Sequence, residues 1–279
     1  LPIPTTETLK LGRAYSTCKE CLPLILTTGL MLEYLDKRKD DEITIFFMAK
    51  TAGPCRQGQY HIFQENIIKK LKIKNAGILT GDDEKSFNEF GNKFMLIAWI
   101  TILTTECFED IRSVLKVLAE NKKEALEIFN QEFENILQAV KKGNINNLLN
   151  QIKTSSKALS QIKLTKPLSQ AKIIFLTGEI YVRREEFSRL NLIEILEKNG
   201  FVVLIAPVSE YLYYSNYLAK ENKRLMINLN DKIKARISDI IQRIFEKKIK
   251  KDFSETGLMH YDLVEIEKTM NHSLHLISK

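Results

Sequence analysis

Three of the four cysteines in this sequence lie in two short motifs whose spacing suits an iron–sulfur cluster. Cys18 and Cys21 form a C-x2-C pair, and Cys55 follows 34 residues after Cys21. A C-x2-C pair in a turn can direct both thiolates to one centre, and a thiolate from a separate strand end can complete a three-thiolate face. Nearby cations, among them Arg56, favour the thiolate form and offset the charge of an anionic cluster. The spacing therefore predicts a cluster bound by Cys18, Cys21 and Cys55.

Other interpretations of these cysteines remain open: zinc, a thioredoxin-like dithiol, a disulfide, or plain burial. A structural zinc site uses four ligands and usually a second close pair, whereas this sequence has one C-x2-C motif and no histidine pair near it. The fourth cysteine, Cys107, lies in a stretch typical of an amphipathic helix. We predict that Cys107 packs as a small buried hydrophobe.

The elements that must position Cys21 and Cys55 follow the order of a βαβ unit. The patterns predict helices at residues 23–34 and 60–71 and strands at residues 42–49 and 75–80. Strands in this order pair in parallel, which places Cys55 just past the carboxyl end of the first strand. Ligands of open α/β sheets gather at that edge.

The rest of the chain predicts a helical segment followed by a second α/β segment. Trp99 in the helical segment is expected in the core. Later patterns predict strands at residues 172–177 and 201–206 with a helix at residues 189–199 between them. We therefore expect an α/β protein with two Rossmann-like or flavodoxin-like units and an intervening helical region. The expected segments are residues 1–83, 84–165 and 166–279.

A polar loop follows the first strand of the second α/β segment, in the motif Gly178-Glu-Ile-Tyr-Val-Arg-Arg184. Glu179 and Arg183 in this loop could orient an anionic substrate or contact a cluster. A capped turn with a surface ion pair explains the same residues equally well. The sequence alone leaves both interpretations open.

Four ordered motifs together resemble the 2-hydroxyacyl-CoA dehydratase-like family, in particular the C-terminal part of acyl-CoA dehydratase activase fusion proteins. The motifs are Glu20-Cys21-Leu-Pro followed by Thr28-Gly29, then Gly53-Pro-Cys55-Arg-x-Gly-Gln-Tyr60, then Gly178-Glu-Ile-Tyr-Val-Arg-Arg-x-x-Phe-Ser188, then Pro207-Val-Ser-Glu210. Ordered motifs are more specific than any one alone.

The resemblance implies low-potential electron transfer. In the family, an ATP-dependent activator passes an electron to a cluster held by cysteine thiolates, for reductive chemistry on an acyl-CoA or another small molecule. On this chain the resemblance implies Cys21 and Cys55 as ligands, Arg56 and Tyr60 as cofactor-binding residues, and Glu179 and Arg183 as catalytic residues. Cys18 falls outside the best-matched letters and is a neighbouring candidate for the third thiolate.

One family feature is missing from these residues. The family carries a further cysteine in a Pro-Phe-Gly-Cys-Met-Pro loop, and no such loop is present here. We therefore expect a fragment that binds a [4Fe-4S] or related cluster weakly or not at all. The alternative function is a non-catalytic scaffold or interaction domain of a multidomain activase without a cluster.

Composition narrows the class of protein. The chain has 279 residues, 44% hydrophobic content and a net charge of +7, enough for a sizeable core. It lacks a long apolar stretch and the pattern of a signal peptide, so we expect a cytoplasmic protein without a membrane partner. No nucleic-acid-binding motif accompanies the charge. A dimer is compatible with the sequence.

Basic residues are concentrated between Lys220 and Lys251, interleaved with apolar residues at helical spacing. The simpler interpretation is an amphipathic helix with a solvated basic face. The alternative is a surface for an acidic partner or for the phosphates of CoA.

Overall fold

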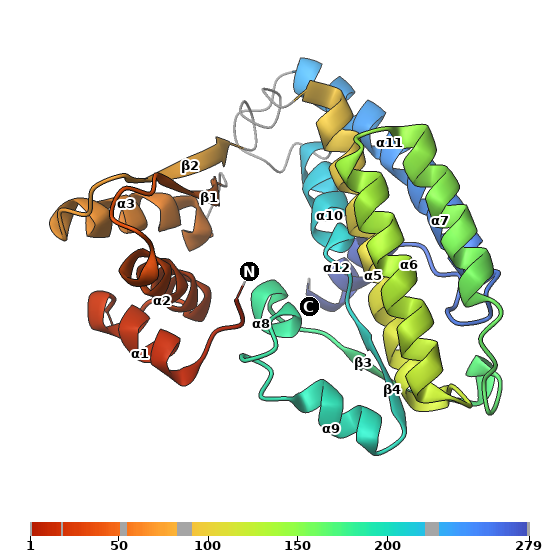
Figure 1. The fold of residues 1–279 in the computed structure, drawn as a ribbon. Helices are drawn as coiled ribbons and strands as arrows, with labels where there is room; N and C mark the ends of the chain where they lie inside the picture. Colours follow the sequence, from red (N-terminus) through yellow and green to blue (C-terminus); the bar gives the residue numbers. More distant parts are fainter. Residues whose placement is uncertain (1, 18, 51–54, 83–90, 221–228, 278–279) are drawn as a thin grey trace. The chain divides into compact units, whose positions relative to one another are not determined.

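The chain divides into two compact units, which are described separately below (Figure 1). The first unit comprises Leu1–Met95 with Arg184–Leu190, and the second comprises Leu96–Arg183 with Asn191–Lys279. The second unit contains most of the two segments expected at residues 84–165 and 166–279. The structure is a computed structural model and describes residues 2–17, 19–50, 55–82, 91–220 and 229–277.

Two helices, α1 (Thr6–Tyr15) and α2 (Leu22–Lys37), form the N-terminal part of the first unit. Their backbones approach closely at two glycines. A Cβ atom at Gly12 would lie 2.0 Å from the carbonyl oxygen of Ile25, and one at Gly29 would lie 2.1 Å from that of Thr8. Neither position has room for a side chain, which explains the glycine of the Thr28-Gly29 motif by helix packing.

A parallel βαβ unit follows, as predicted. Strands β1 and β2 pair in parallel over their whole length. Met31 and Leu32 of α2 pack with Ile67 and Ile68 to form the small core of this unit. The elements are β1 (Thr44–Lys50), the 3-10 helix η1 (Arg56–Gln59), α3 (Tyr60–Lys70) and β2 (Ala76–Asp82).

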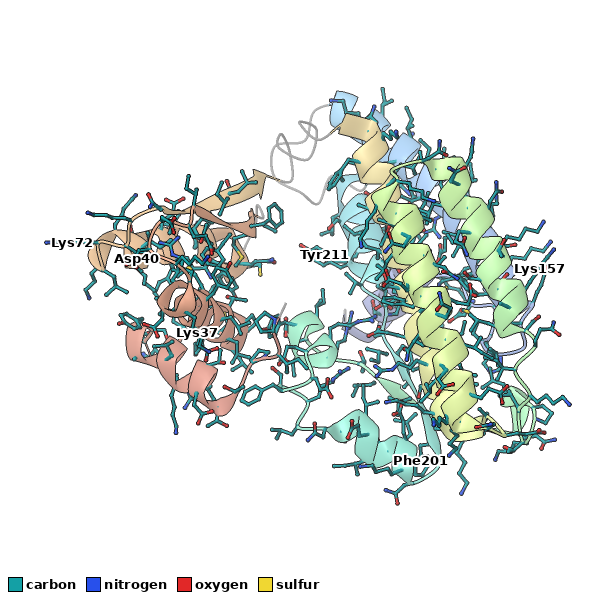
Figure 2. All side chains as sticks on the ribbon, viewed as in Figure 1. Lys37, Asp40, Lys72, Lys157, Phe201 and Tyr211 are labelled. Atoms are coloured by element: carbon teal, nitrogen blue, oxygen red, sulfur yellow. The ribbon has the colours of Figure 1, made fainter. Side chains whose placement is uncertain are left out.

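Three long helices supply much of the core of the second unit. The side chains of Asn121 and Asn144 cap the second and third of them. Phe108 is fully buried among aromatic rings, and Trp99 is buried as predicted. Polar side chains such as Lys157 point outward (Figure 2). The helices are α5 (Gly91–Leu118), α6 (Lys122–Lys141) and α7 (Ile145–Leu159).

The second βαβ pattern is also present. Strands β3 (Lys172–Leu176) and β4 (Phe201–Ile205) pair in parallel. The helix predicted at residues 189–199 is shorter than expected: α9 spans Leu192–Lys198 because Leu190 and Asn191 adopt positive φ angles of 50° and 59°. The remaining elements of the unit are η2 (Leu168–Gln170), α8 (Ile180–Arg184), α10 (Ser209–Lys220), α11 (Leu229–Ser254) and α12 (Ile266–Ile277).

The α/β class is confirmed at the level of mixed helices and parallel strands. Each of the two sheets has two strands among the described residues. Within the same residues, no helix combines the length and the apolar character needed to cross a bilayer.

Candidate functional site

The two cysteine motifs meet in the first unit. The Arg56 side chain donates a hydrogen bond of 2.8 Å from Nη1 to the carbonyl oxygen of Lys19, and the same nitrogen lies 3.6 Å from Glu20 Oε2. The Cys21 Sγ atom lies 3.0 Å from the Tyr60 hydroxyl. Three side chains of the predicted site, from Cys21, Arg56 and Tyr60, therefore converge on one junction between the loop before α2 and the start of α3.

Cys21 and Cys55 each lie at the beginning of a helix. Cys21 is the N-cap residue of α2, and Cys55 is the N-cap residue of η1, which runs directly into α3. Neither N-cap side chain bonds to its own helix, and neither first turn contains an acidic residue. The positive ends of two helix dipoles are thus directed at the loops that carry the thiols, which suits an anionic ligand.

The described thiols supply part of the donor set that a cluster needs. Cys55 is exposed, Cys21 is partly buried, and neither forms a disulfide. Cys18 lies outside the described residues, as do residues 51–54. Among the residues that are described, no three His, Cys, Asp or Glu side chains are grouped closely enough to hold a metal ion. Cys21 and Cys55 therefore stay predicted ligands, and a cluster at this place would need further thiolates beside them.

Cys107 is buried on α5, as predicted. Its side chain is 1% exposed, and burial raises the pKa of its thiol well above the ordinary range. A thiol that stays protonated and shielded is a poor nucleophile and a poor ligand. Cys107 is therefore a packing residue.

This difference predicts the order in which the thiols react. In the reduced native protein, iodoacetamide should modify Cys55 first and Cys21 more slowly, and it should reach Cys107 only on unfolding. Peptide mass spectrometry of samples quenched over time would measure each rate. Labelling of native Cys107 at a rate similar to that of Cys55 would contradict the assignment of Cys107 to the core.

Glu179 and Arg183 lie in the second unit, where both support the loop between β3 and α8. A carboxylate oxygen of Glu179 accepts a hydrogen bond of 2.8 Å from the Val182 backbone N–H, so Glu179 caps α8. Arg183 is buried and donates to the carbonyl oxygens of Gly178 and Pro207 at 2.9 and 3.1 Å. Arg183 thus ties together the two loops that follow β3 and β4, while its predicted catalytic role stays a prediction.

Comparison with known proteins identifies no relative of this chain. No family model, curated protein or solved structure matches this chain. The family resemblance therefore remains a prediction, and so do the ligand roles of Cys21 and Cys55.

A second candidate site, which the sequence did not predict, is a cavity of about 570 Å³ in the second unit. It opens beside the carboxyl ends of β3 and β4, the edge at which α/β sheets bind ligands. Its apolar lining includes Phe175 and Leu204, and its polar lining includes Asp110, Lys250 and His260.

The Asp110 carboxyl group of this cavity has an unusually high pKa. Burial, followed by the nearby Glu106 carboxylate, raises the pKa of Asp110 to about 7. A carboxyl group with that pKa can give and take a proton near neutral pH. The sequence contains a signal for this shifted carboxyl group. Glu106 and Asp110 are spaced four residues apart, on the same face of α5 as the buried Cys107, so two carboxyl groups lie close together on a buried face.

Proposed function

We propose that the first unit holds an iron–sulfur cluster through Cys21 and Cys55 and takes part in low-potential electron transfer. The observation that carries this proposal is the junction made by Arg56, which joins the loop of one cysteine motif to the helix of the other. Packing of α2 against α3 brings the two helices together, and the Arg56 contacts add a direct link between the two cysteine motifs at the helix starts.

The surrounding residues have clear tasks in this proposal. Cys21 and Cys55 bind iron as thiolates, and Arg56 and the starts of α2 and α3 offset the negative charge. Tyr60 directs its hydroxyl to the Cys21 sulfur at 3.0 Å, which is the kind of contact that tunes a reduction potential. The bound cluster would supply one-electron chemistry. Cys18 or a thiolate from outside this chain completes the ligand set.

The family resemblance extends the proposal to partners. An ATP-dependent activator would deliver the electron, and an acyl-CoA or another small molecule would receive it, with Glu179 and Arg183 at the substrate. The two βαβ units would then be the cores of Rossmann-like or flavodoxin-like units. These assignments rest on the motifs and on the position of both loops at the carboxyl ends of parallel strands.

Anaerobic reconstitution tests the cluster. The chain is mixed with ferrous iron, sulfide and excess 2-mercaptoethanol, whose thiolate can replace a missing protein ligand, and is then desalted. Because a protein ligand is expected to be missing, we expect the unchanged chain to retain iron and sulfide when the added thiol is kept in the desalting buffer and little of either without it. Cys21→Ser or Cys55→Ser should lose most of both even with the thiol, because each variant removes one thiolate. Iron and sulfide analysis and the visible absorption spectrum are the measurements.

Cys107→Ser is the matched control, since it changes a cysteine that is not part of the junction. It should retain as much iron as the unchanged chain, and thermal unfolding should show that all variants remain folded. Cys18→Ser then decides whether the third thiolate comes from this chain. Equal iron loss in all four variants would refute the ligand assignment. No retained cluster in the unchanged chain would favour the alternative of a scaffold or interaction domain.

A further inference from the structure

Helix α11 of the second unit exposes an apolar stripe. Five of its isoleucines are between 41% and 60% exposed. A row of apolar side chains on the outside of a folded unit commonly marks a surface that binds another molecule. The members of this isoleucine stripe are Ile233, Ile237, Ile240, Ile241 and Ile244.

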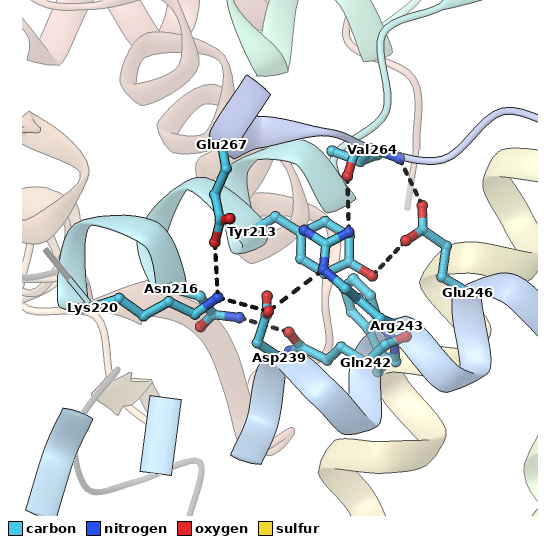
Figure 3. Close-up of polar contacts among 10 residues, drawn as sticks. Tyr213, Asn216, Lys220, Asp239, Gln242, Arg243, Glu246, Val264 and Glu267 are labelled. Atoms are coloured by element: carbon cyan, nitrogen blue, oxygen red, sulfur yellow. Dashed lines mark hydrogen bonds and ion pairs between the residues drawn. The ribbon is translucent and has the colours of Figure 1, made fainter. Parts of the chain in front are cut away.

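The opposite face of α11 explains why these isoleucines point outward. Asp239 accepts from Lys220 Nζ at 2.7 Å, and the Gln242 side chain accepts from Asn216 at 2.7 Å. Glu246 accepts from the Tyr213 hydroxyl at 2.8 Å. Figure 3 shows these polar groups of α11 directed at partners on α10. In this part of α11 these polar side chains face the interior and the apolar side chains of the stripe face outward. This is the opposite of an ordinary amphipathic surface helix.

The spacing of the stripe matches a helix–helix seam. Ile233, Ile237, Ile240 and Ile244 follow one another at intervals of four, three and four residues, the a and d pattern of a heptad. β-Branched side chains are stiff and lose little freedom when they pack as knobs into a facing helix. A hollow of about 470 Å³ borders the stripe at Ile240 and could receive a side chain of that helix.

Charge identifies the kind of partner. In this heptad the e and g positions beside the seam include Lys234, Arg236 and Lys248, all of them exposed. The carboxylates between Ile233 and Lys251 that the structure describes on α11, those of Asp239 and Glu246, are buried. A second copy of α11 would place like charges opposite one another, whereas a helix with Glu or Asp at its e and g positions would pair with them.

We propose that the isoleucine stripe of α11 binds an acidic amphipathic helix, with apolar residues at its a and d positions and carboxylates at e and g. The residues involved all lie in the second unit, so this proposal stands or falls separately from the cluster proposal.

A synthetic helix can test the proposal on the whole chain. The probe is a fluorescent peptide of about three heptads with Ile at a, Leu at d and Glu at e and g, and its binding is followed by fluorescence anisotropy. We expect saturable binding that weakens with salt, and binding at least about tenfold weaker for the same peptide with Lys at e and g.

Substitutions in the isoleucine stripe test whether the peptide binds to α11. Joint Ile237→Gln and Ile240→Gln should weaken binding at least about tenfold, because they remove apolar contacts at the centre of the seam. Ile195→Gln on α9 is the matched control, since Ile195 is also 53% exposed, and it should leave binding unchanged. Joint Arg236→Glu and Lys248→Glu should reverse the preference in favour of the Lys peptide.

Three outcomes would overturn the proposal. The first is no binding of the Glu peptide to the unchanged chain. The second is stripe-dependent binding to phosphatidylserine vesicles without peptide binding, which would identify a membrane surface. The third is a dimer in sedimentation velocity that the paired isoleucine variants abolish, which would identify a second copy of this chain as the partner.

Discussion

Replacing Glu246 with alanine is expected to lower the free energy of unfolding by about 3–5 kcal/mol. The Glu246 carboxylate is buried and accepts from the Tyr213 hydroxyl and the Val264 N–H (Figure 3). It also pairs with Lys250 Nζ at 3.0 Å. Alanine removes the carboxylate that pairs with the buried Lys250 ammonium and leaves the two donors, the Tyr213 hydroxyl and the Val264 N–H, unpaired. Urea unfolding followed by circular dichroism measures the loss.

Two further variants separate the buried network from general effects on α11. Glu255→Ala removes an exposed carboxylate near the end of the same region and should change the free energy of unfolding by no more than about 1 kcal/mol. Joint Glu246→Leu and Lys250→Met should cost less than Glu246→Ala alone, because neither charge is then left buried and unpaired. A loss below about 1 kcal/mol for Glu246→Ala would contradict the network.

The Asp110 carboxyl should make the protein less stable as the pH rises from about 4 to about 7. Its pKa is raised from 3.8 to about 7 by burial and by Glu106, while Lys250 and the Ile205 backbone oppose the shift. Between these values the folded state binds the proton and the unfolded state does not, so deprotonation favours unfolding. A shift of about 3 pKa units corresponds to a loss of about 4 kcal/mol across that interval.

Asp110→Asn isolates this contribution, because asparagine keeps the shape and an acceptor oxygen but does not ionise. The difference in free energy of unfolding between variant and unchanged chain should grow in favour of the variant from about pH 4 to about pH 7, and then stay constant. The other charged group that faces Asp110, the Asp262 carboxylate, is present in both proteins. Parallel pH profiles for the two chains would show that Asp110 titrates normally.

Much of the local fold could be predicted from sequence because periodicity reports it directly. The strand predicted at residues 42–49 is β1 (Thr44–Lys50), and the helix predicted at residues 60–71 is α3 (Tyr60–Lys70). Parallel pairing follows from the strand–helix–strand order. Burial of Cys107 and Trp99 follows from their place on an apolar helix face. The positions of Cys21 and Cys55 at helix starts were likewise readable from the adjacent Pro23 and Gly53-Pro54.

What the sequence could not supply are pairings between distant residues. Glu106 accepts from the Ser209 backbone and hydroxyl at 2.8 Å, across 103 residues of chain. The role of Arg183 as a tie between two loops likewise depends on Pro207. For α11, the interpretation of an amphipathic helix with a solvated basic face is right for basic side chains such as Lys234 and Lys248, but wrong in placing the isoleucines inward, since they are exposed as well. The inward face depends instead on donors on α10 such as Lys220 and Tyr213, which the sequence of α11 does not contain.

The glycine contact between α1 and α2 has a consequence for the thiols. Backbones that touch at Gly12 and Gly29 cannot slide or separate without losing their packing, so the two helices form a stiff hairpin. The short connection between them carries Cys18 and Cys21, and its end points are therefore fixed in advance. For the cluster proposed above, binding would then immobilise fewer degrees of freedom, and a lower entropic penalty would mean a higher affinity for the same donor atoms. The two glycines would thus raise the affinity of the proposed site without contacting its metal.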